Sequence, residues 1–182
     1  AFGNHEHRLM ADPERYGDGF RGYRERLRGR GVEFLQNGHA QVETGDGTSL
    51  VIWGWDGETR FYKKLRPAVL KTEDLERTLG TLWPGAYHIL LAHSPQFGKT
   101  YFSWGADLIL SGHYHGGVCR FSENRGLIAP NFRLFPAYCC GSFTRGAQHM
   151  VVSSGLGEHT VPLRIHNPRE LIVIELVHGG DV

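Results

Sequence analysis

Short apolar runs separated by polar, glycine-containing turns predict an α/β protein. The run at residues 49–55 follows a shorter one at 40–44, and Gly45-Asp46-Gly47 between them is a strong hairpin signal. The runs at 87–92 and 107–110 have the length of buried strands. Further extended runs are expected at residues 32–35, 118–121, 149–153 and 171–177. We expect the last two to close a second sheet.

Helical spacing predicts two longer helices and one short one. At residues 12–30, Phe20, Tyr23 and Leu27 recur on one helix face. Arginines fill the other positions of this helix, so it is either a patch for anionic substrates or a solvated face. Residues 72–79 form the second helix, with Thr72 as its expected cap and Gly80 as its end. A short helix is expected around residues 101–104.

Two strands are expected to deliver histidines to one edge of a sheet. His93 follows the run at 87–92, and His113 follows the run at 107–110, 20 residues later. This separation suits a strand–helix–strand crossover, in which both strands end at the same edge. Ligand sites of α/β sheets gather at the carboxyl ends of strands. The two histidines therefore predict a shared site.

The stretch Ser111 to Gly117 has the chemistry of a metal-binding loop. His113 and His115 are two residues apart in a glycine-rich segment, and extended backbone would point both rings to the same side. Histidine is the commonest metal ligand among side chains. Asn4 and His5 form a third place where polar donors enter a turn.

Composition excludes several classes of protein. The 182 residues are 40% hydrophobic and 21% charged, which is ordinary for one soluble globular domain. The net charge of +1 gives no basic field for nucleic acid. Three cysteines, two of them adjacent, do not form a secreted disulfide framework. No apolar run is long enough to span a bilayer.

Three motifs resemble those of calcineurin-like metallophosphoesterases. Gly3-Asn4-His5-Glu6 resembles their GNH[DE] motif, Ala92-His93-Ser94-Pro95 their single-histidine motif, and Gly112-His113-Tyr114-His115 their GHxH motif. The resemblance covers nearly the whole chain. The tail, residues 154–170, is similar to that of the YkuE-like phosphodiesterases, some of which act on nucleotide-linked lipid precursors.

The resemblance implies a fold, a metal centre and residue roles. The fold is the C-terminal portion of an α/β/β/α sandwich with two sheets. Asn4, His93 and His113 would bind one divalent metal and His115 a second, the ions being Mn, Zn or Fe. His5 would stabilise the transition state or protonate the leaving oxygen, and the reaction would be hydrolysis of a phosphodiester or pyrophosphate.

Other residues are weaker candidates for the same site. Arg133 and Arg145 lie in or near a loop-rich region, residues 116–148, that would rim the metals, and they are expected to bind phosphate oxygens. Asp56 is a candidate carboxylate behind the ligands, whereas His7 is interpreted as structural. Trp53 and Trp55 share one strand face and either stack on a substrate or belong to the core.

Two further motifs of the resembled family, Asp-x-His and Gly-Asp-x-x-Asp, have no counterpart upstream of Gly3. Residues 1–182 are therefore expected to be one domain lacking its N-terminal part, and to be inactive or very weakly active alone. The alternatives are a degenerate binding module without turnover and a mononuclear zinc hydrolase with Glu6 as base.

The expected partners and location follow from the same resemblance. The substrate is expected to be a phosphorylated small molecule or a lipid-linked one, and no nucleic acid is expected. The expected location is the cytoplasm, with attachment to the membrane surface through the missing N-terminal half.

Overall fold

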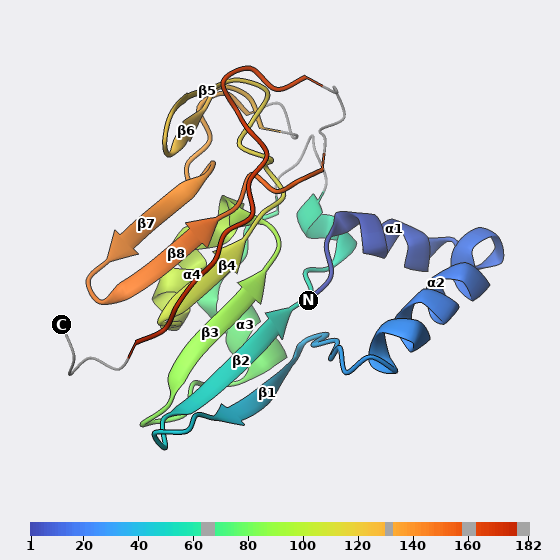
Figure 1. Ribbon diagram of the computed structural model, residues 1–182, viewed down its shortest axis with the longest axis vertical. Coiled ribbons are helices and arrows are strands. Elements are labelled where there is room, and N and C mark those ends of the chain that lie inside the picture. Colours follow the sequence, from blue (N-terminus) through green and yellow to red (C-terminus); the bar gives the residue numbers. More distant parts are fainter. Residues whose placement is uncertain (63–67, 130–132, 158–162, 178–182) are drawn as a thin grey trace.

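The computed structural model describes residues 1–62, 68–129, 133–157 and 163–177. Its centre is a six-stranded sheet with the order β1-β2-β3-β4-β8-β7 (Figure 1). The strands are β1 Gly38–Glu43, β2 Ser49–Trp55, β3 Tyr87–Ala92, β4 Leu108–Ser111, β7 Gly141–Arg145 and β8 Gln148–Val152. The inner strands β2, β3, β4 and β8 run parallel, and the edge strands β1 and β7 are antiparallel to their neighbours.

A second, two-stranded sheet pairs β5 Arg120–Ser122 with β6 Arg125–Gly126. The mixed helix and strand content, with two sheets, confirms the α/β fold class. The hairpin predicted around Gly45-Asp46-Gly47 is confirmed, because β1 and β2 pair across this turn and Gly47 has a φ of 82°.

Two helices cover one face of the large sheet and form the core with it. They are α3 Thr72–Leu79 and α4 Gly98–Trp104, and both lie behind the strands in Figure 1. Trp53 and Trp55 are 1% and 2% exposed in this core, so they are core residues. The helix predicted at 72–79 is confirmed, but its N-cap is Lys71 rather than Thr72.

Several predicted strands are corrected by the structure. Residues 149–153 do form a strand, but β8 joins the large sheet beside β4 rather than closing a second sheet. Residues 171–177 and 32–35 belong to no strand. The run at 118–121 is a strand only from Arg120, and Cys119 adds an isolated bridge to Ile165.

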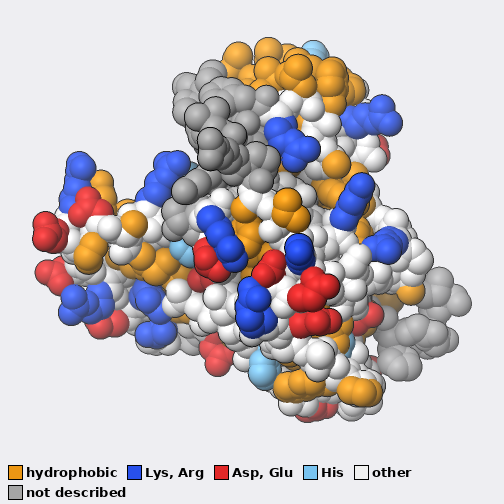
Figure 2. Space-filling model, turned by 180° about the vertical axis from the view of Figure 1, so that it is seen from behind, with side chains coloured by type: hydrophobic (Ala, Val, Ile, Leu, Met, Phe, Trp, Pro, Cys, Tyr) orange, Lys and Arg blue, Asp and Glu red, His pale blue; other side chains and the backbone are white. Residues whose placement is uncertain are grey.

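Two helices near the N-terminus project from the sheet (Figure 1). These are α1 Asn4–Ala11, which the sequence pattern did not predict, and α2 Pro13–Arg28, which it did. Arg24 of α2 donates to Gln36 Oε1 at 2.9 Å, and its guanidinium lies over the ring of Phe2 at 5.3 Å. Figure 2 shows acidic and basic side chains interspersed over these helices, as on a solvated face.

Short 3₁₀ helices complete the described elements: η1 Thr59–Tyr62 and η2 Pro95–Phe97. None of the helices in the described ranges has the length and apolar character needed to cross a membrane.

Candidate metal centre

Two parallel strands place His93 and His113 at one edge of the sheet. β3 ends at Ala92 and β4 at Ser111, and the strands are paired in register. Their ends are held together by the Gly112 N–H, which donates to the His93 carbonyl at 3.1 Å. The Ser111 hydroxyl adds a bond to the Ala92 carbonyl at 2.6 Å. The predicted crossover, which ends both strands at the same edge, is confirmed.

The start of α1 packs directly on the ring of His93. A Cβ atom at Gly3, the residue before the helix, would lie 2.9 Å from the His93 ring, so only glycine fits there. Glu6 accepts a hydrogen bond from the Gly3 N–H at 2.8 Å. This bond caps the helix and directs the side chain of Asn4 toward the sheet edge.

Asn4 joins the two histidines. Its Oδ1 lies 3.1 Å from His93 Nε2 and 3.1 Å from His113 Nδ1. The two imidazole centroids are 5.0 Å apart. One amide oxygen and two ring nitrogens therefore converge from segments that are 89 and 109 residues apart along the chain.

Burial keeps His93 neutral. The pKa of His93 is lowered from 6.5 to about 4, chiefly by burial; Glu6 opposes the shift, and nearby His115, His5 and His7 add to it. A neutral imidazole has a lone pair for a metal ion, so His93 is ready to act as a ligand near pH 7.

His115 lies near the same group, since its charge contributes to the lowered pKa of His93. It is half-buried, and burial followed by the charge of Arg164 lowers its pKa. His5 is exposed on the first turn of α1, and its charge contributes to the lowered pKa of both His93 and His115. The structure therefore gathers all five predicted centre residues in one region, with His5 on its open side.

The loop that carries His113 and His115 is not extended, which corrects the expected conformation. Both residues have a positive φ, 64° and 49°, and Gly116 and Gly117 follow with 72° and 76°. The expected extended backbone, in which residues i and i+2 share a side, is therefore not the conformation of this loop.

Asn167 holds this loop in place. It is 3% exposed, and its Nδ2 donates to the carbonyls of His115 and Gly117, each at 2.6 Å. A Cβ atom at Gly116 would lie 2.3 Å from Asn167 Oδ1. Nothing in the sequence pattern points to Asn167, because a single asparagine 50 residues downstream carries no local signal.

A group of polar side chains stands behind the ligands. Asp56 is buried and accepts from the Phe2 N–H at 2.8 Å, which anchors the segment that leads into Asn4. His7 Nε2 lies 3.7 Å from Asp56 Oδ1, in keeping with a structural residue. The ring of Tyr62, also missed from the sequence, lies 5.9 Å from that of His113, and burial raises the pKa of Tyr62.

Of the two arginines proposed for phosphate binding, Arg145 is not brought to Asn4. Arg145 ends β7 and pairs with Gln148, so it lies at the opposite end of the strands from His113. It donates to Ser103 Oγ of α4 at 3.2 Å. Arg133 is exposed, and its carbonyl accepts from the Ala129 N–H at 3.0 Å.

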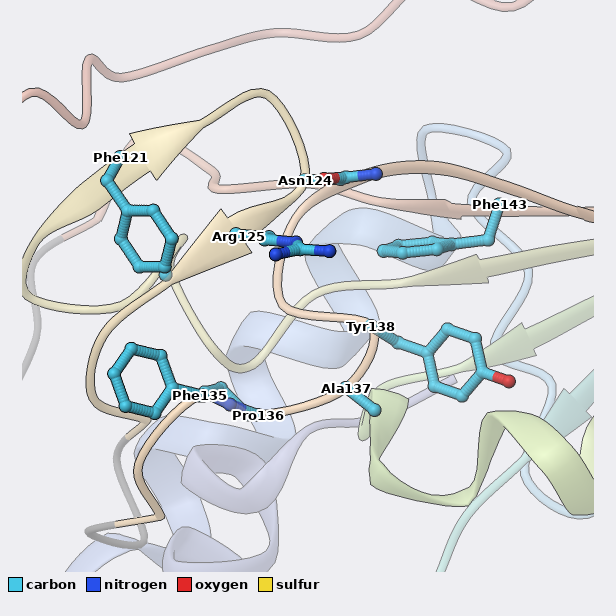
Figure 3. Close-up of a pocket in the computed structure, with 9 residues that line it drawn as sticks. Phe121, Asn124, Arg125, Phe135, Pro136, Ala137, Tyr138 and Phe143 are labelled. Carbon is cyan, nitrogen blue, oxygen red and sulfur yellow. The ribbon is translucent and has the colours of Figure 1, made fainter.

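A cavity of about 570 Å³ lies on the other side of the glycine loop (Figure 3). Its wall includes Gly126, where a Cβ would lie 2.4 Å from the Gly116 carbonyl oxygen. Two aromatic pairs line it, Phe121 with Phe135 and Tyr138 with Phe143. Arg125, drawn between these pairs in Figure 3, is the one charged side chain among the described residues of the lining. The cavity suits an apolar group with an anionic part.

The donor set fits one divalent metal ion. Within the described ranges no group of three or more His, Cys, Asp or Glu side chains is placed to hold a metal. Asn4 lies outside these four residue types, and with His93 and His113 it makes three donors that meet at 3.1 Å. An amide oxygen and two imidazole nitrogens suit borderline cations such as Zn²⁺, Mn²⁺ or Fe²⁺.

Comparison with known proteins finds curated relatives over most of the chain. It is 28% identical over 175 residues to the uncharacterized metallophosphoesterase YkuE of Bacillus subtilis, covering 96% of this chain and 54% of that protein. It is 30% identical over 183 residues to a transmembrane protein with metallophosphoesterase domain of Danio rerio, covering 97% and 38%. An uncharacterized metallophosphoesterase of Aquifex aeolicus is 28% identical over 166 residues, covering 82% and 56%.

The chain thus spans about half the length, or less, of these relatives. No family model and no solved structure matches it. The relatives confirm the resemblance that the three motifs predicted.

Proposed function

We propose that this chain, which is homologous to metallophosphoesterases over nearly its whole length, hydrolyses phosphodiesters or pyrophosphates with the help of divalent metal ions. The convergence of Asn4 Oδ1 with a nitrogen of His93 and of His113, each at 3.1 Å, carries the proposal. These three donors belong to the three motifs on which the resemblance rests.

The residues divide between two proposed metal positions. Asn4, His93 and His113 hold one ion, and His115 contributes to a second. When bound, the ions supply a water of lowered pKa and positive charge for the phosphate oxygens. Asn4 also positions the two histidine rings, because its oxygen lies between their nitrogens.

His5 acts on the leaving group. It lies on the exposed side of the cluster, on the first turn of α1, where a substrate has access. Its imidazole can hold a proton and give it to the departing oxygen, a role that accelerates reactions by roughly 10²–10⁴-fold. The rigid fit of Gly3 against His93 keeps this first turn at the site.

The substrate we propose is a nucleotide-linked lipid. The aromatic cavity behind Gly116 and the Arg125 side chain in its lining support a substrate with both an apolar and an anionic part. Arg133 stays a candidate for a phosphate oxygen. We also propose that the protein works in the cytoplasm at a membrane surface. The name of one relative, a transmembrane protein with metallophosphoesterase domain, supports this setting.

A metal-binding module without turnover is the alternative function. It is supported by the second proposed metal position, to which only His115 is assigned among the described residues, because two-metal hydrolysis needs both ions to be held.

The test is hydrolysis of bis(p-nitrophenyl) phosphate together with calorimetric titration of Mn²⁺. We expect Mn²⁺ to bind the wild-type protein and not His113→Ala, and turnover by the full-length natural polypeptide to depend on Mn²⁺. His149→Ala is the matched control, because His149 is an exposed histidine on β8 and lies at the far end of that strand. Binding without turnover would establish the module, and Mn²⁺ binding unaffected by His113→Ala would refute both functions.

A further inference from the structure

Five large apolar side chains are exposed on the lobe that carries the small sheet of β5 and β6. They are Phe121, Leu134, Phe135, Leu163 and Ile165, and their exposed fractions range from 42% at Ile165 to 66% at Phe135. Single exposed apolar residues are ordinary, but a contiguous group marks a surface that another molecule covers. We call this group the apolar tip.

Contacts between separate segments make the apolar tip one surface. The rings of Phe121 on β5 and of Phe135 have centroids 6.0 Å apart. Leu134 directly precedes Phe135 in the chain. Ile165 of the tail forms a parallel bridge with Cys119, two residues before Phe121. The tip residues are therefore held side by side although they come from different segments.

The apolar tip lies at one end of the molecule. Figure 1 shows β5 and β6 at one end of the longest axis, and Figure 2 shows hydrophobic side chains gathered at that end with basic side chains beside them. A specific protein partner needs about 800 Å² of complementary surface on each side, whereas a bilayer accepts apolar side chains in any arrangement. A small apolar end therefore suits a lipid surface better than a protein surface.

The charges beside the apolar tip select the kind of lipid. Over residues 121–125 and 133–135 the charged residues are Arg125, Arg133 and Glu123, and all three are exposed. Two cations outweigh one carboxylate, so this surface has a net positive charge. Arginines near a membrane surface are attracted by anionic headgroups. The apolar tip thus matches an anionic bilayer in charge.

The cavity on the other side of the glycine loop reaches the surface at the same place. Phe121 and Phe135 line this cavity, and both are more than half exposed at the apolar tip (Figure 3). Arg125 belongs to the same lining. A lipid bound at the tip therefore has its apolar part beside the cavity.

We propose that the apolar tip is a docking surface for an anionic bilayer. Phe121, Leu134 and Phe135 enter the interfacial region, and Arg125 and Arg133 lie at the level of the lipid phosphates. This docking rests on the membrane setting of the proposed function and gives that setting a place on the fold. It requires neither metal ions nor turnover, because the tip contains none of the residues assigned to the metals.

Co-sedimentation with lipid vesicles tests the docking surface. The full-length natural polypeptide in EDTA is mixed with vesicles of phosphatidylcholine, either alone or with phosphatidylglycerol. We expect Leu134→Ser and Phe135→Ser each to lower binding about tenfold, because each change removes one apolar side chain from the bilayer. Arg125→Gln should lower binding about fivefold, and only to the vesicles that contain phosphatidylglycerol.

Val42→Ser is the matched control. Val42 is 43% exposed, similar to Ile165, and it lies on the edge strand β1, away from the small sheet (Figure 1). This variant should bind both kinds of vesicle as the wild type does.

Two results would overturn the docking surface. One is vesicle binding by Leu134→Ser and Phe135→Ser that equals binding by Val42→Ser. The other is a wild-type dimer in light scattering that Phe135→Ser converts to a monomer, because a second copy would then cover the tip. A protein that binds vesicles through the tip and hydrolyses no phosphodiester would support docking and refute the proposed reaction, so the two failures are distinguishable.

Discussion

At the scale of single residues, the centre depends on one amide and one glycine. Asn4 can accept from two imidazoles at once because a carbonyl oxygen has two lone pairs. Gly3 is required for a different reason: its φ of −100° suits any residue, but the His93 ring leaves no room for a Cβ. The chemistry of Asn4 therefore relies on the small size of its neighbour.

Gly3→Ala should weaken metal binding without removing a ligand. The new methyl group would meet the His93 ring at 2.9 Å, and the start of α1 would have to move away from the sheet edge. We expect an affinity for Mn²⁺ lower by about tenfold, or roughly 1.4 kcal/mol, in calorimetric titration.

Gly19→Ala in α2 is the control for Gly3→Ala. A Cβ there meets nothing within 4 Å, so this change should leave Mn²⁺ affinity unaltered and stabilise the helix by about 0.5–1 kcal/mol. Equal affinity of the two variants would show that the packing of Gly3 on His93 does not position Asn4.

The buried ring of His93 predicts a pH dependence of stability. Its pKa of about 4 in the folded protein is below the ordinary 6.5, so the unfolded chain binds a proton between these values and the folded chain does not. Metal-free protein should therefore lose stability as the pH falls from 6.5 to 4, by about 1.4 kcal/mol per pH unit from this group.

Urea unfolding in EDTA at pH 7 and pH 5 measures the effect of His93. His93→Asn should lack this part of the slope, and the difference between the two proteins isolates it from other titrating groups. A slope that His93→Asn leaves unchanged would mean that the ring is hydrated in the folded state.

At the scale of elements, the site depends on how two strand ends are continued. β3 runs into His93 directly, and β4 runs into a left-handed turn that holds His113 and His115. A turn with a positive φ at two histidines is costly for those residues. Its stability comes from outside the loop, from the side chain of Asn167.

Asn167→Ala should destabilise the protein and loosen the histidine loop. The carbonyls of His115 and Gly117 would each lose a bond of 2.6 Å in a buried position. We expect the free energy of unfolding to fall by about 1–3 kcal/mol, with weaker Mn²⁺ binding. Asn124→Ala, at an exposed asparagine, should change stability by less than about 0.5 kcal/mol. If urea unfolding showed similar losses of stability in both variants, the role of Asn167 in holding the histidine loop would be contradicted.

At the scale of the whole molecule, the described residues form only part of the proposed metal centre and cover the large sheet with helices on one face. The three residues proposed to bind the first metal ion, Asn4, His93 and His113, lie together. Only His115 is assigned to the second ion. In the part of the chain that the structure describes, the helices α3 and α4 cover one face of the large sheet. Both observations fit relatives that are about twice as long.

The isolated residues 1–182 should bind metal but turn over slowly. We expect residues 1–182 to hydrolyse bis(p-nitrophenyl) phosphate at least about 100-fold more slowly than the full-length natural polypeptide does. The reason is that only His115 is assigned to the second metal ion, which needs further ligands. The measurement is the rate of p-nitrophenol release at saturating Mn²⁺, with Mn²⁺ binding to residues 1–182 as the check on folding. Robust Mn²⁺-dependent turnover by these residues alone would refute this prediction.

Much of the framework was determined by the sequence itself. Local patterns such as the turn at Gly47, the helix at 72–79 and the crossover between His93 and His113 depend on neighbours along the chain, and the structure confirms all three. The three motifs also predicted the relatives, because a motif consists of residue types and their order, which can be read without a structure.

What only the tertiary structure decided depends on contacts between distant segments. Three features follow from how the strands are ordered in the sheet. They are the hydrogen bonds of Asn167 to the histidine loop, the ring of Tyr62 beside His113, and the position of Arg145 at the far end of β7. Strand order arises from packing of whole faces, which a local pattern does not encode. For the same reason residues 171–177 read as a strand from their composition, while the structure shows that their backbone still has no partner among the described residues.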